Sequence, residues 1–304
     1  MSQGGSAAGP LARPLPNPEY RSAHLTFCPG GAGCLILSGG DRMALRRAAH
    51  LDTMYQELPL PDRFQAARDD GFDAVELWSW EDRDLAAVRA AADRAGISIC
   101  CCDGDGPVSL IDPDRREAYL GYLRRSLAAA RLLGVPGVTI HSNGLGPDGG
   151  VLDPRDDLSH TVKLCALYDG LRASAALAEQ AGVDLYLEPL NVTTDHPGNF
   201  LRDTRTAAEL VRLVGSPRLR VLFDLYHMQL SEGHLCDTIR QYADTFGHVH
   251  AADAPGRHEP GTGEIAFPRV YQALEQAGYT GFVSYELFPA RSTAEAVAAI
   301  RASG

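Results

Sequence analysis

Four residues with metal-binding side chains each follow an apolar stretch in the second half of the sequence. They are Glu188 in LYLEP, Asp224 in VLFDLYH, His250 in HVHAAD and Glu286 in VSYEL, at intervals of 36, 26 and 36 residues. Three carboxylates and one imidazole suit a divalent ion of the Mn²⁺, Mg²⁺ or Co²⁺ kind. If the three carboxylates were buried together without a cation, they would repel one another strongly. The alternative is that each carboxylate only caps a helix or forms a salt bridge.

Each interval is about the length of one strand and one helix, so successive strand–helix units are expected to position these side chains. From residue 43 onward, short apolar stretches alternate eight times with segments that carry apolar residues at helical spacing. The predicted strands are 47–52, 74–78, 97–102, 137–141, 183–188, 219–224, 247–251 and 282–286. The clearest predicted helices are 85–95, 117–133, 167–181 and 294–301.

Regular alternation of strands and helices predicts a parallel sheet of the α/β class. Eight units within residues 43–304 favour a single (β/α)₈ TIM barrel, which typically has roughly 250 residues. An open dinucleotide-binding sheet would need a glycine-rich turn after its first strand, and the sequence after Leu51 has none. In a barrel, polar residues at the carboxyl ends of the strands face the active-site mouth, so we expect the four metal-binding side chains to meet there.

Residues 1–42 differ in composition from the rest of the chain. They are rich in Gly, Pro, Ser and Ala and show neither helical nor strand periodicity. We expect a disordered or loosely docked extension. A second hypothesis is that translation starts at Met43, because Gly39-Gly40 can be encoded by a purine-rich stretch of the ribosome-binding type.

Further side chains are expected to face the barrel mouth. His141 and Glu76 end predicted strands, and we expect each to contact a substrate or to belong to a polar network. Arg257 lies in the loop PGRHEPGTG, where its guanidinium can bind a substrate carboxylate or hydroxyl, or else pair with Glu259. Trp78 is expected either to form an apolar wall for a small sugar or simply to pack.

Composition and charge exclude several classes of partner. The net charge of −11 and the pI near 5.3 disfavour binding to nucleic acid or to an anionic membrane surface. The seven cysteines form no CxxC pair, which indicates reduced thiols in a cytoplasmic protein. The sequence indicates neither an organic cofactor nor a membrane span, and it leaves a homo-oligomer open.

Several longer motifs resemble those of the hydroxypyruvate isomerase family, within the xylose-isomerase-like sugar isomerase and epimerase barrels. The motifs are LEPLN at 187–191, FDLYHMQ at 223–229, HAADAPGRHEPGTGEI at 250–265 and YTGFVSYELFPA at 279–290. The stretch PGRHEPGTGE is long and specific, whereas LEPLN and FDLYH are shared more widely. The resemblance runs from about Arg46 to the C-terminus and does not include residues 1–42.

The resemblance implies a divalent metal bound by Glu188, Asp224, His250 and Glu286, with the two glutamates also moving the proton. It further implies that His227 hydrogen-bonds a substrate oxygen. Such chemistry moves a carbonyl between adjacent carbons through a metal-bound enediolate, with a carboxylate on each side of the substrate. The expected function is therefore a metal-dependent isomerase of a small hydroxy-carbonyl compound.

Two positions bear on the substrate, and the first of them departs from the family pattern. Phe288 stands where a lysine is expected, and that lysine would be a natural partner for a substrate carboxylate. His250 matches the ketose epimerases, whereas some hydroxypyruvate isomerases carry Gln. The substrate therefore stays open among hydroxypyruvate, other 2-oxo acids and ketoses.

Three alternatives use the same barrel. The first is a ketose 3-epimerase or a 2-oxo-acid sugar isomerase acting through the same site. The second is a DNA-repair endonuclease, which the acidic charge and the single histidine ligand disfavour. The third is a non-catalytic sugar-binding barrel, which has no need of both Glu188 and Glu286 as proton carriers.

Overall fold

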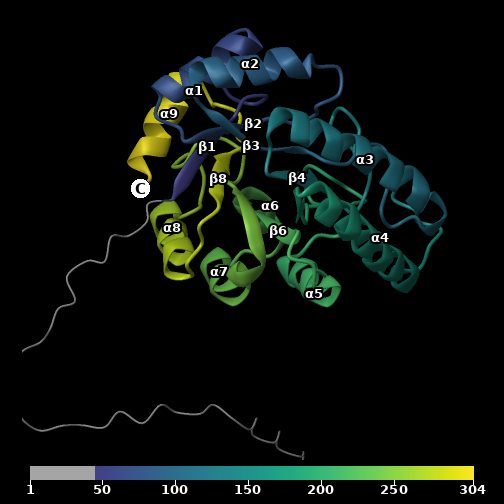
Figure 1. Ribbon diagram of the computed structural model, residues 1–304. Coiled ribbons are helices and arrows are strands. Elements are labelled where there is room, and N and C mark those ends of the chain that lie inside the picture. Colours follow the sequence, from purple (N-terminus) through teal and green to yellow (C-terminus); the bar gives the residue numbers. More distant parts are fainter. Residues whose placement is uncertain (1–44) are drawn as a thin grey trace, which may run out of the picture. The chain divides into compact units, whose positions relative to one another are not determined.

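The computed structural model describes residues 45–304, which form a closed parallel barrel with the strands in sequence order. The predicted extension at 1–42 and the hypothetical start at Met43 lie outside the described residues. Figure 1 shows helices surrounding the strands, with β1 next to β8 where the barrel closes. The predicted (β/α)₈ architecture is confirmed.

The strands are β1 (Arg46–His50), β2 (Ala74–Glu76), β3 (Ser98–Asp103), β4 (Gly137–Ile140), β5 (Asp184–Leu187), β6 (Leu219–Asp224), β7 (Phe246–His250) and β8 (Phe282–Tyr285). The helices are α1 (Leu60–Asp69), α2 (Leu85–Ala95), α3 (Arg116–Leu133), α4 (His160–Ala181), α5 (Thr204–Val214), α6 (Leu225–Ser231), α7 (Leu235–Tyr242), α8 (Phe267–Gln276) and α9 (Thr293–Ala302). Short 3₁₀ turns, η1 (Pro113–Arg115) and η2 (Ala243–Thr245), precede α3 and β7.

The predicted element bounds are mostly within two residues of the observed ones, with two instructive differences. β2 stops at Glu76, where its register against β3 shifts, so the predicted strand 74–78 is too long. α4 begins at His160, seven residues before the predicted helix 167–181, because the Ser159 side chain caps it by accepting from the backbone N–H of Val162.

The inside of the barrel explains how the strands place polar side chains at the mouth. A small apolar cluster fills the interior, and it includes Ala48, Ala74, Tyr186 and Leu222. Because side chains alternate along a strand, the residue two positions later also points inward. Those next inward residues are His50, Glu76, Glu188 and Asp224. The apolar interior layer therefore lies beneath a layer of titratable side chains.

Two further observations bear on the sequence predictions. Cys100, Cys101 and Cys102 are buried in β3, as expected for small apolar thiols, whereas Cys165 is exposed. Among residues 45–304, no helix is both long enough and apolar enough to cross a membrane.

Candidate active site

The four side chains predicted to bind a metal lie together at the carboxyl ends of β5 to β8. Glu188, Asp224, His250 and Glu286 each offer one ligand atom, and these atoms all lie within 4.8 Å of one another. All four side chains are buried. The structure therefore brings the predicted set together, while the role of each residue stays a prediction. We call these four residues the acidic cluster.

The hydrogen bonding of the acidic cluster is incomplete in a way that fits a cation. Within the described part of the chain, His250 Nδ1 and Glu188 Oε1 are buried polar atoms without a hydrogen-bond partner. His250 Nδ1 lies 3.1 Å from Glu286 Oε2 and 3.6 Å from Glu188 Oε1. A buried polar atom left unpaired costs roughly 1–3 kcal/mol. A divalent ion among these atoms would use them as ligands and offset the repulsion between the carboxylates.

Asp224 has two tasks, one for each oxygen. Its Oδ1 caps α6 by accepting from the backbone N–H groups of Tyr226 and His227, at 2.7 and 3.2 Å. Its Oδ2 lies 3.9 Å from His250 Nδ1, on the side of the acidic cluster. Burial, followed by the charge of Glu188, raises the pKa of Asp224 to about 7. Asp224 therefore caps a helix, as the alternative interpretation of the four residues expects, and it also belongs to the acidic cluster.

His227 lies beside Asp224, as its position in the motif FDLYH predicts. Asn191 Nδ2 donates to His227 Nδ1 at 2.7 Å, which leaves the ring proton on Nε2, 3.5 Å from Asp224 Oδ2. Burial and the charge of Arg257 lower the pKa of His227 well below its ordinary value. The imidazole is therefore a neutral donor next to the acidic cluster.

Glu188 is held from the side of β4. His141 Nε2 lies 3.1 Å from Glu188 Oε2, and His141 Nδ1 lies 3.1 Å from Asp105 Oδ1. Burial lowers the pKa of His141, but the carboxylates of Asp105 and Glu188 raise it well above its ordinary value. Burial raises the pKa of Glu188, yet the hydrogen bond from His141 and the nearby imidazole of His250 hold it below its ordinary value. Both residues therefore stay charged and paired at neutral pH.

Glu286 receives two strong donors. Trp78 Nε1 donates to its Oε1, and Arg257 Nη2 donates to its Oε2, both at 2.6 Å. Burial raises the pKa of Glu286, but the charges of Arg257 and His250 hold it well below its ordinary value. The carboxylate is therefore ionised and fixed in orientation.

The loop after β7 is built to present Arg257. The φ of Arg257 is 57°, in the left-handed region. This conformation costs a non-glycine residue energy and is common at functional sites. The buried Asp253 carboxylate accepts from the backbone N–H groups of Gly261, Gly263 and Ile265, and so orders the loop. Arg257 pairs with Glu286 and Asp224, and the Glu259 carboxylate instead accepts from the Ala290 N–H. The alternative of an Arg257–Glu259 pair is therefore wrong.

Glu76 belongs to a polar network, one of the two alternatives predicted for it. Its Oε1 lies 3.0 Å from His250 Nε2, and its Oε2 lies 2.9 Å from His248 Nε2. Both oxygens are thus hydrogen-bonded, and the side chain is 3% exposed. This arrangement leaves a substrate little access to Glu76.

Sequence reasoning missed several residues that contact the acidic cluster or its partners. Asp105 holds His141, Asn191 fixes the tautomer of His227, and His248 holds Glu76. Trp78 is expected from the sequence either to form an apolar wall or simply to pack, and neither alternative includes its hydrogen bond to Glu286. Two of these residues carried a signal: Asn191 lies in the motif LEPLN, and His248 lies two residues before His250 on the same strand, so it also points inward.

Phe288 lies at the rim of the mouth, next to Trp78. It is 37% exposed, and its ring centroid is 6.3 Å from that of Trp78. The position expected to hold a cationic lysine therefore presents an aromatic ring. Arg257 is the arginine that ion-pairs with the cluster among the described residues, and it is already paired with Glu286.

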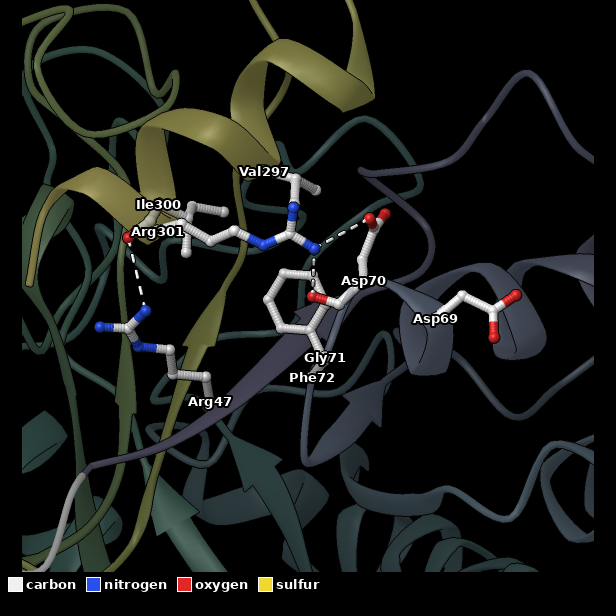
Figure 2. Close-up of a pocket in the computed structure, with 8 residues that line it drawn as sticks. All are labelled: Arg47, Asp69, Asp70, Gly71, Phe72, Val297, Ile300 and Arg301. Atoms are coloured by element: carbon white, nitrogen blue, oxygen red, sulfur yellow. Dashed lines mark hydrogen bonds and ion pairs between the residues drawn. The ribbon is translucent and has the colours of Figure 1, made fainter.

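A separate cavity of about 240 Å³ lies by the amino end of β1, between α1 and α9. Figure 2 shows Arg301 donating to Asp70 and Arg47 directed at the carbonyl of Ile300. Its lining carries two arginines and two aspartates. Arg301 pairs with Asp70, and the Asp69 carboxylate accepts from Gln65 outside the lining. The cavity is remote from the carboxyl ends of the strands, where barrel active sites lie.

Comparisons with known proteins agree with this geometry. The xylose isomerase-like TIM barrel family matches residues 64–303. A putative hydroxypyruvate isomerase of Homo sapiens is 34% identical over 84% of this chain and 94% of its own length. A 2-oxo-tetronate isomerase of Cupriavidus necator is 31% identical, covering 82% and 94%.

A solved structure agrees on the fold. The crystal structure of an AP endonuclease, family 2, from Brucella melitensis has a TM-score of 0.76 at 27% identity, covering 84% of this chain and 97% of that one. This similarity confirms the barrel, and the relatives named as isomerases confirm the predicted class of enzyme, an isomerase. The chain belongs to the hydroxypyruvate isomerase family, within the xylose isomerase-like TIM barrels.

Proposed function

We propose that this chain is a divalent-metal-dependent isomerase that moves a carbonyl between adjacent carbons of a small hydroxy-carbonyl compound. The observation that carries the proposal is the acidic cluster, in which four ligand atoms converge within 4.8 Å. The unpartnered His250 Nδ1 and Glu188 Oε1 support it, because both are aimed where a cation would lie. The similarity to named isomerases supports the reaction class.

Glu188, Asp224, His250 and Glu286 would hold a dication of the Mn²⁺, Mg²⁺ or Co²⁺ kind. When bound, the ion supplies Lewis acidity to the substrate carbonyl and to the neighbouring hydroxyl. The protein contributes a buried, preorganised set of charges, so that little reorganisation is needed during the reaction.

Glu188 and Glu286 come from β5 and β8, the two outer strands of the four that form the acidic cluster. From these two edges of the cluster, one glutamate can take a proton from a substrate carbon and return it to the former carbonyl oxygen. The other can take the proton of the adjacent hydroxyl and deliver it to the former carbonyl carbon, so that both end the reaction ionised. His141 fixes Glu188, and Trp78 fixes Glu286. These contacts keep both carboxylates ionised and oriented, as a general base requires.

His227 and Arg257 are the proposed substrate contacts. His227 offers a neutral Nε2–H beside Asp224, which suits a substrate hydroxyl or carbonyl oxygen. Arg257 has a buried Nε without a hydrogen-bond partner in the described chain, so this group is available to a substrate oxygen. The Nε2 of His141 is already paired with Glu188, so His141 could contact only a substrate atom that lies next to that carboxylate.

A second candidate within the same chemistry is a ketose 3-epimerase or a 2-oxo-acid sugar isomerase. His250 and the aromatic Phe288 favour a ketose over an acid at the rim, whereas the relatives named for hydroxypyruvate and 2-oxo-tetronate favour an acid. A non-catalytic sugar-binding barrel is disfavoured because both glutamates are kept ionised and oriented.

Proton NMR in D₂O distinguishes these functions. Purified protein is stripped with a chelator, reloaded with Mn²⁺, Mg²⁺ or Co²⁺, and given hydroxypyruvate, short 2-oxo acids and short ketoses. An isomerase moves the carbonyl and incorporates deuterium at the adjacent carbon, whereas an epimerase inverts a stereocentre and keeps the carbonyl in place. Full turnover by the stripped protein would refute the metal dependence.

A further inference from the structure

Glu76 is a buried carboxylate that bridges two histidines of a strand across the barrel. It ends β2, and its oxygens accept from His250 Nε2 at 3.0 Å and from His248 Nε2 at 2.9 Å. The residues are 172 and 174 positions apart in the sequence, so folding of the whole barrel creates the contact. Glu76 lies at a register shift between β2 and β3, a feature that re-aims side chains near functional sites.

The contact with Glu76 decides which nitrogen of His250 faces the acidic cluster. Because Nε2 keeps the proton given to Glu76, the neutral ring that binds a dication presents its lone pair on Nδ1. Nδ1 lies 3.1 Å from Glu286 Oε2 and 3.6 Å from Glu188 Oε1, and it makes no hydrogen bond within the described residues. The opposite tautomer would direct a proton at the cluster and leave Glu76 facing a bare nitrogen.

We infer that Glu76 is a positioning residue that fixes the ring orientation and tautomer of His250, so that Nδ1 is offered to the dication. This inference rests on the metal dependence proposed above. Histidines that bind metals commonly donate their second ring N–H to a carboxylate, and removing that carboxylate typically weakens metal binding by about 10–100-fold. Glu76 therefore acts on the metal through His250, without touching the substrate.

His248 anchors the other side of Glu76. Its ring stacks on Tyr186 with centroids 5.4 Å apart and planes 12° from parallel. Glu76, Cys101 and His248 also lie close enough to be considered as metal ligands. However, Glu76 Oε2 is hydrogen-bonded to His248, and Cys101 Sγ pairs with Thr139 Oγ1 at 3.3 Å. Hydrogen bonds thus already satisfy this second group, which supports its role as an anchor.

The first test is Mn²⁺ affinity, measured from the electron paramagnetic resonance signal of free Mn²⁺ during titration. Glu76→Ala is expected to weaken binding by about 10–100-fold. Glu76→Gln is expected to weaken it less, because the amide oxygen can still accept from one histidine. His248→Gln is the matched control, because it leaves the Glu76–His250 hydrogen bond in place and is expected to change affinity far less than Glu76→Ala. Circular dichroism and thermal melts check that each variant folds.

The second test reads the tautomer without activity. In protein labelled with ¹⁵N-histidine and loaded with Zn²⁺ as a diamagnetic probe, His250 is assigned by comparison with His250→Gln. The wild type is expected to show a protonated Nε2, with the Nε2 proton signal shifted or lost in Glu76→Ala. A protonated Nδ1 in the wild type would overturn the inference.

The outcomes separate this inference from the proposed function. If the wild type binds Mn²⁺ and both Glu76 variants bind it equally well, the positioning role is refuted while the metal dependence stands. If the wild type binds Mn²⁺ no better than Asp224→Asn, the metal site itself is refuted, and the positioning role with it.

Discussion

The two halves of the barrel mouth differ in what they contribute. Strands β5 to β8 supply the acidic cluster, and we call this side the ligand half. Strands β1 to β4 and their loops supply residues that contact those ligands, and we call this side the support half. Three hydrogen bonds join them: His141 to Glu188, Glu76 to His250, and Trp78 to Glu286.

Asp224 is the exception, and it shows why the halves divide in this way. It is held by backbone N–H groups of its own helix, α6, and needs no partner from β1 to β4. The other three ligands lie on side chains with no such local cap. If the acidic cluster binds a dication as proposed, chelation and positioning are separate tasks in this mouth, and variants in the two halves should fail differently.

The largest effect is expected from the two glutamates of the ligand half. Glu188→Gln and Glu286→Gln keep the shape of the side chain but remove the base, so turnover should fall by on the order of 10³-fold or more. Thermal melts should show a folded protein. Steady-state kinetics on the best substrate gives the measurement, and near-normal turnover in either variant would remove that glutamate from the mechanism.

A smaller effect is expected from the support half. Trp78→Phe removes the Nε1–H donor to Glu286 and keeps an aromatic ring. Because a hydrogen bond to a charged group contributes about 1.5–3 kcal/mol, kcat should fall by at least about 10-fold while Mn²⁺ still binds. If kcat falls as far as in Glu286→Gln, or stays unchanged, the distinction between the two halves breaks down.

Metal binding should depend on pH, because two residues of the acidic cluster are expected to hold protons in the metal-free protein. The folded protein raises the pKa of Asp224 to about 7 from an ordinary value of 3.8, so between these values the metal-free folded state holds a proton that the unfolded chain lacks. The contribution of this raised pKa to the free energy of unfolding of the metal-free protein is fully present below pH 3.8, and it is lost as the pH rises through 7. The pKa of His250, whose burial is outweighed by the charges of Glu76 and Glu286, is also raised.

Since a dication needs both groups deprotonated, Mn²⁺ should bind more weakly at pH 6 than at pH 8, by about 10-fold for Asp224 alone. The increase in Tm on adding Mn²⁺ should therefore be larger at pH 8. Differential scanning calorimetry at the two pH values measures it. An equal increase at both, or a larger one at pH 6, would contradict the proton-linked ligand set.

The smallest effect is expected at the rim, outside both sets of contacts. Phe288→Lys places a cation where the ring now packs against Trp78. An exposed ion pair contributes about 0.2–1 kcal/mol, so kcat/KM for acids relative to neutral sugars should rise by up to about fivefold. Phe288→Met removes the ring without adding charge and serves as the control. An unchanged ratio in Phe288→Lys would exclude this position from selecting carboxylates.

The sequence predicts the ligand half far better than the support half, for a physical reason. Glu188, Asp224, His250 and Glu286 each end an apolar strand, and alternation along the strand directs each one inward. The supporting contacts instead join distant parts of the chain, such as Trp78 and Glu286, which are 208 residues apart. No local spacing encodes such a pair, because the closure of the barrel decides which side chains meet across the mouth.

The fold itself follows from local patterns, and its deviations arise where pairing or capping overrides them. The strand ending at Glu76 is shorter than its apolar run because the ladder shifts register there. Helix α4 starts early because Ser159 caps it before the apolar periodicity begins. Glu76 shows the limit of the sequence: its place at the mouth was predictable, but its binding to two histidines of β7 was not.

The most direct test of the central claim is anomalous X-ray diffraction from crystals soaked in Mn²⁺. One strong anomalous peak is expected, bounded by Glu188, Asp224, His250 and Glu286, and it should be lost in Asp224→Ala. A peak at Glu76, Cys101 and His248 instead, or none within the acidic cluster, would contradict that claim.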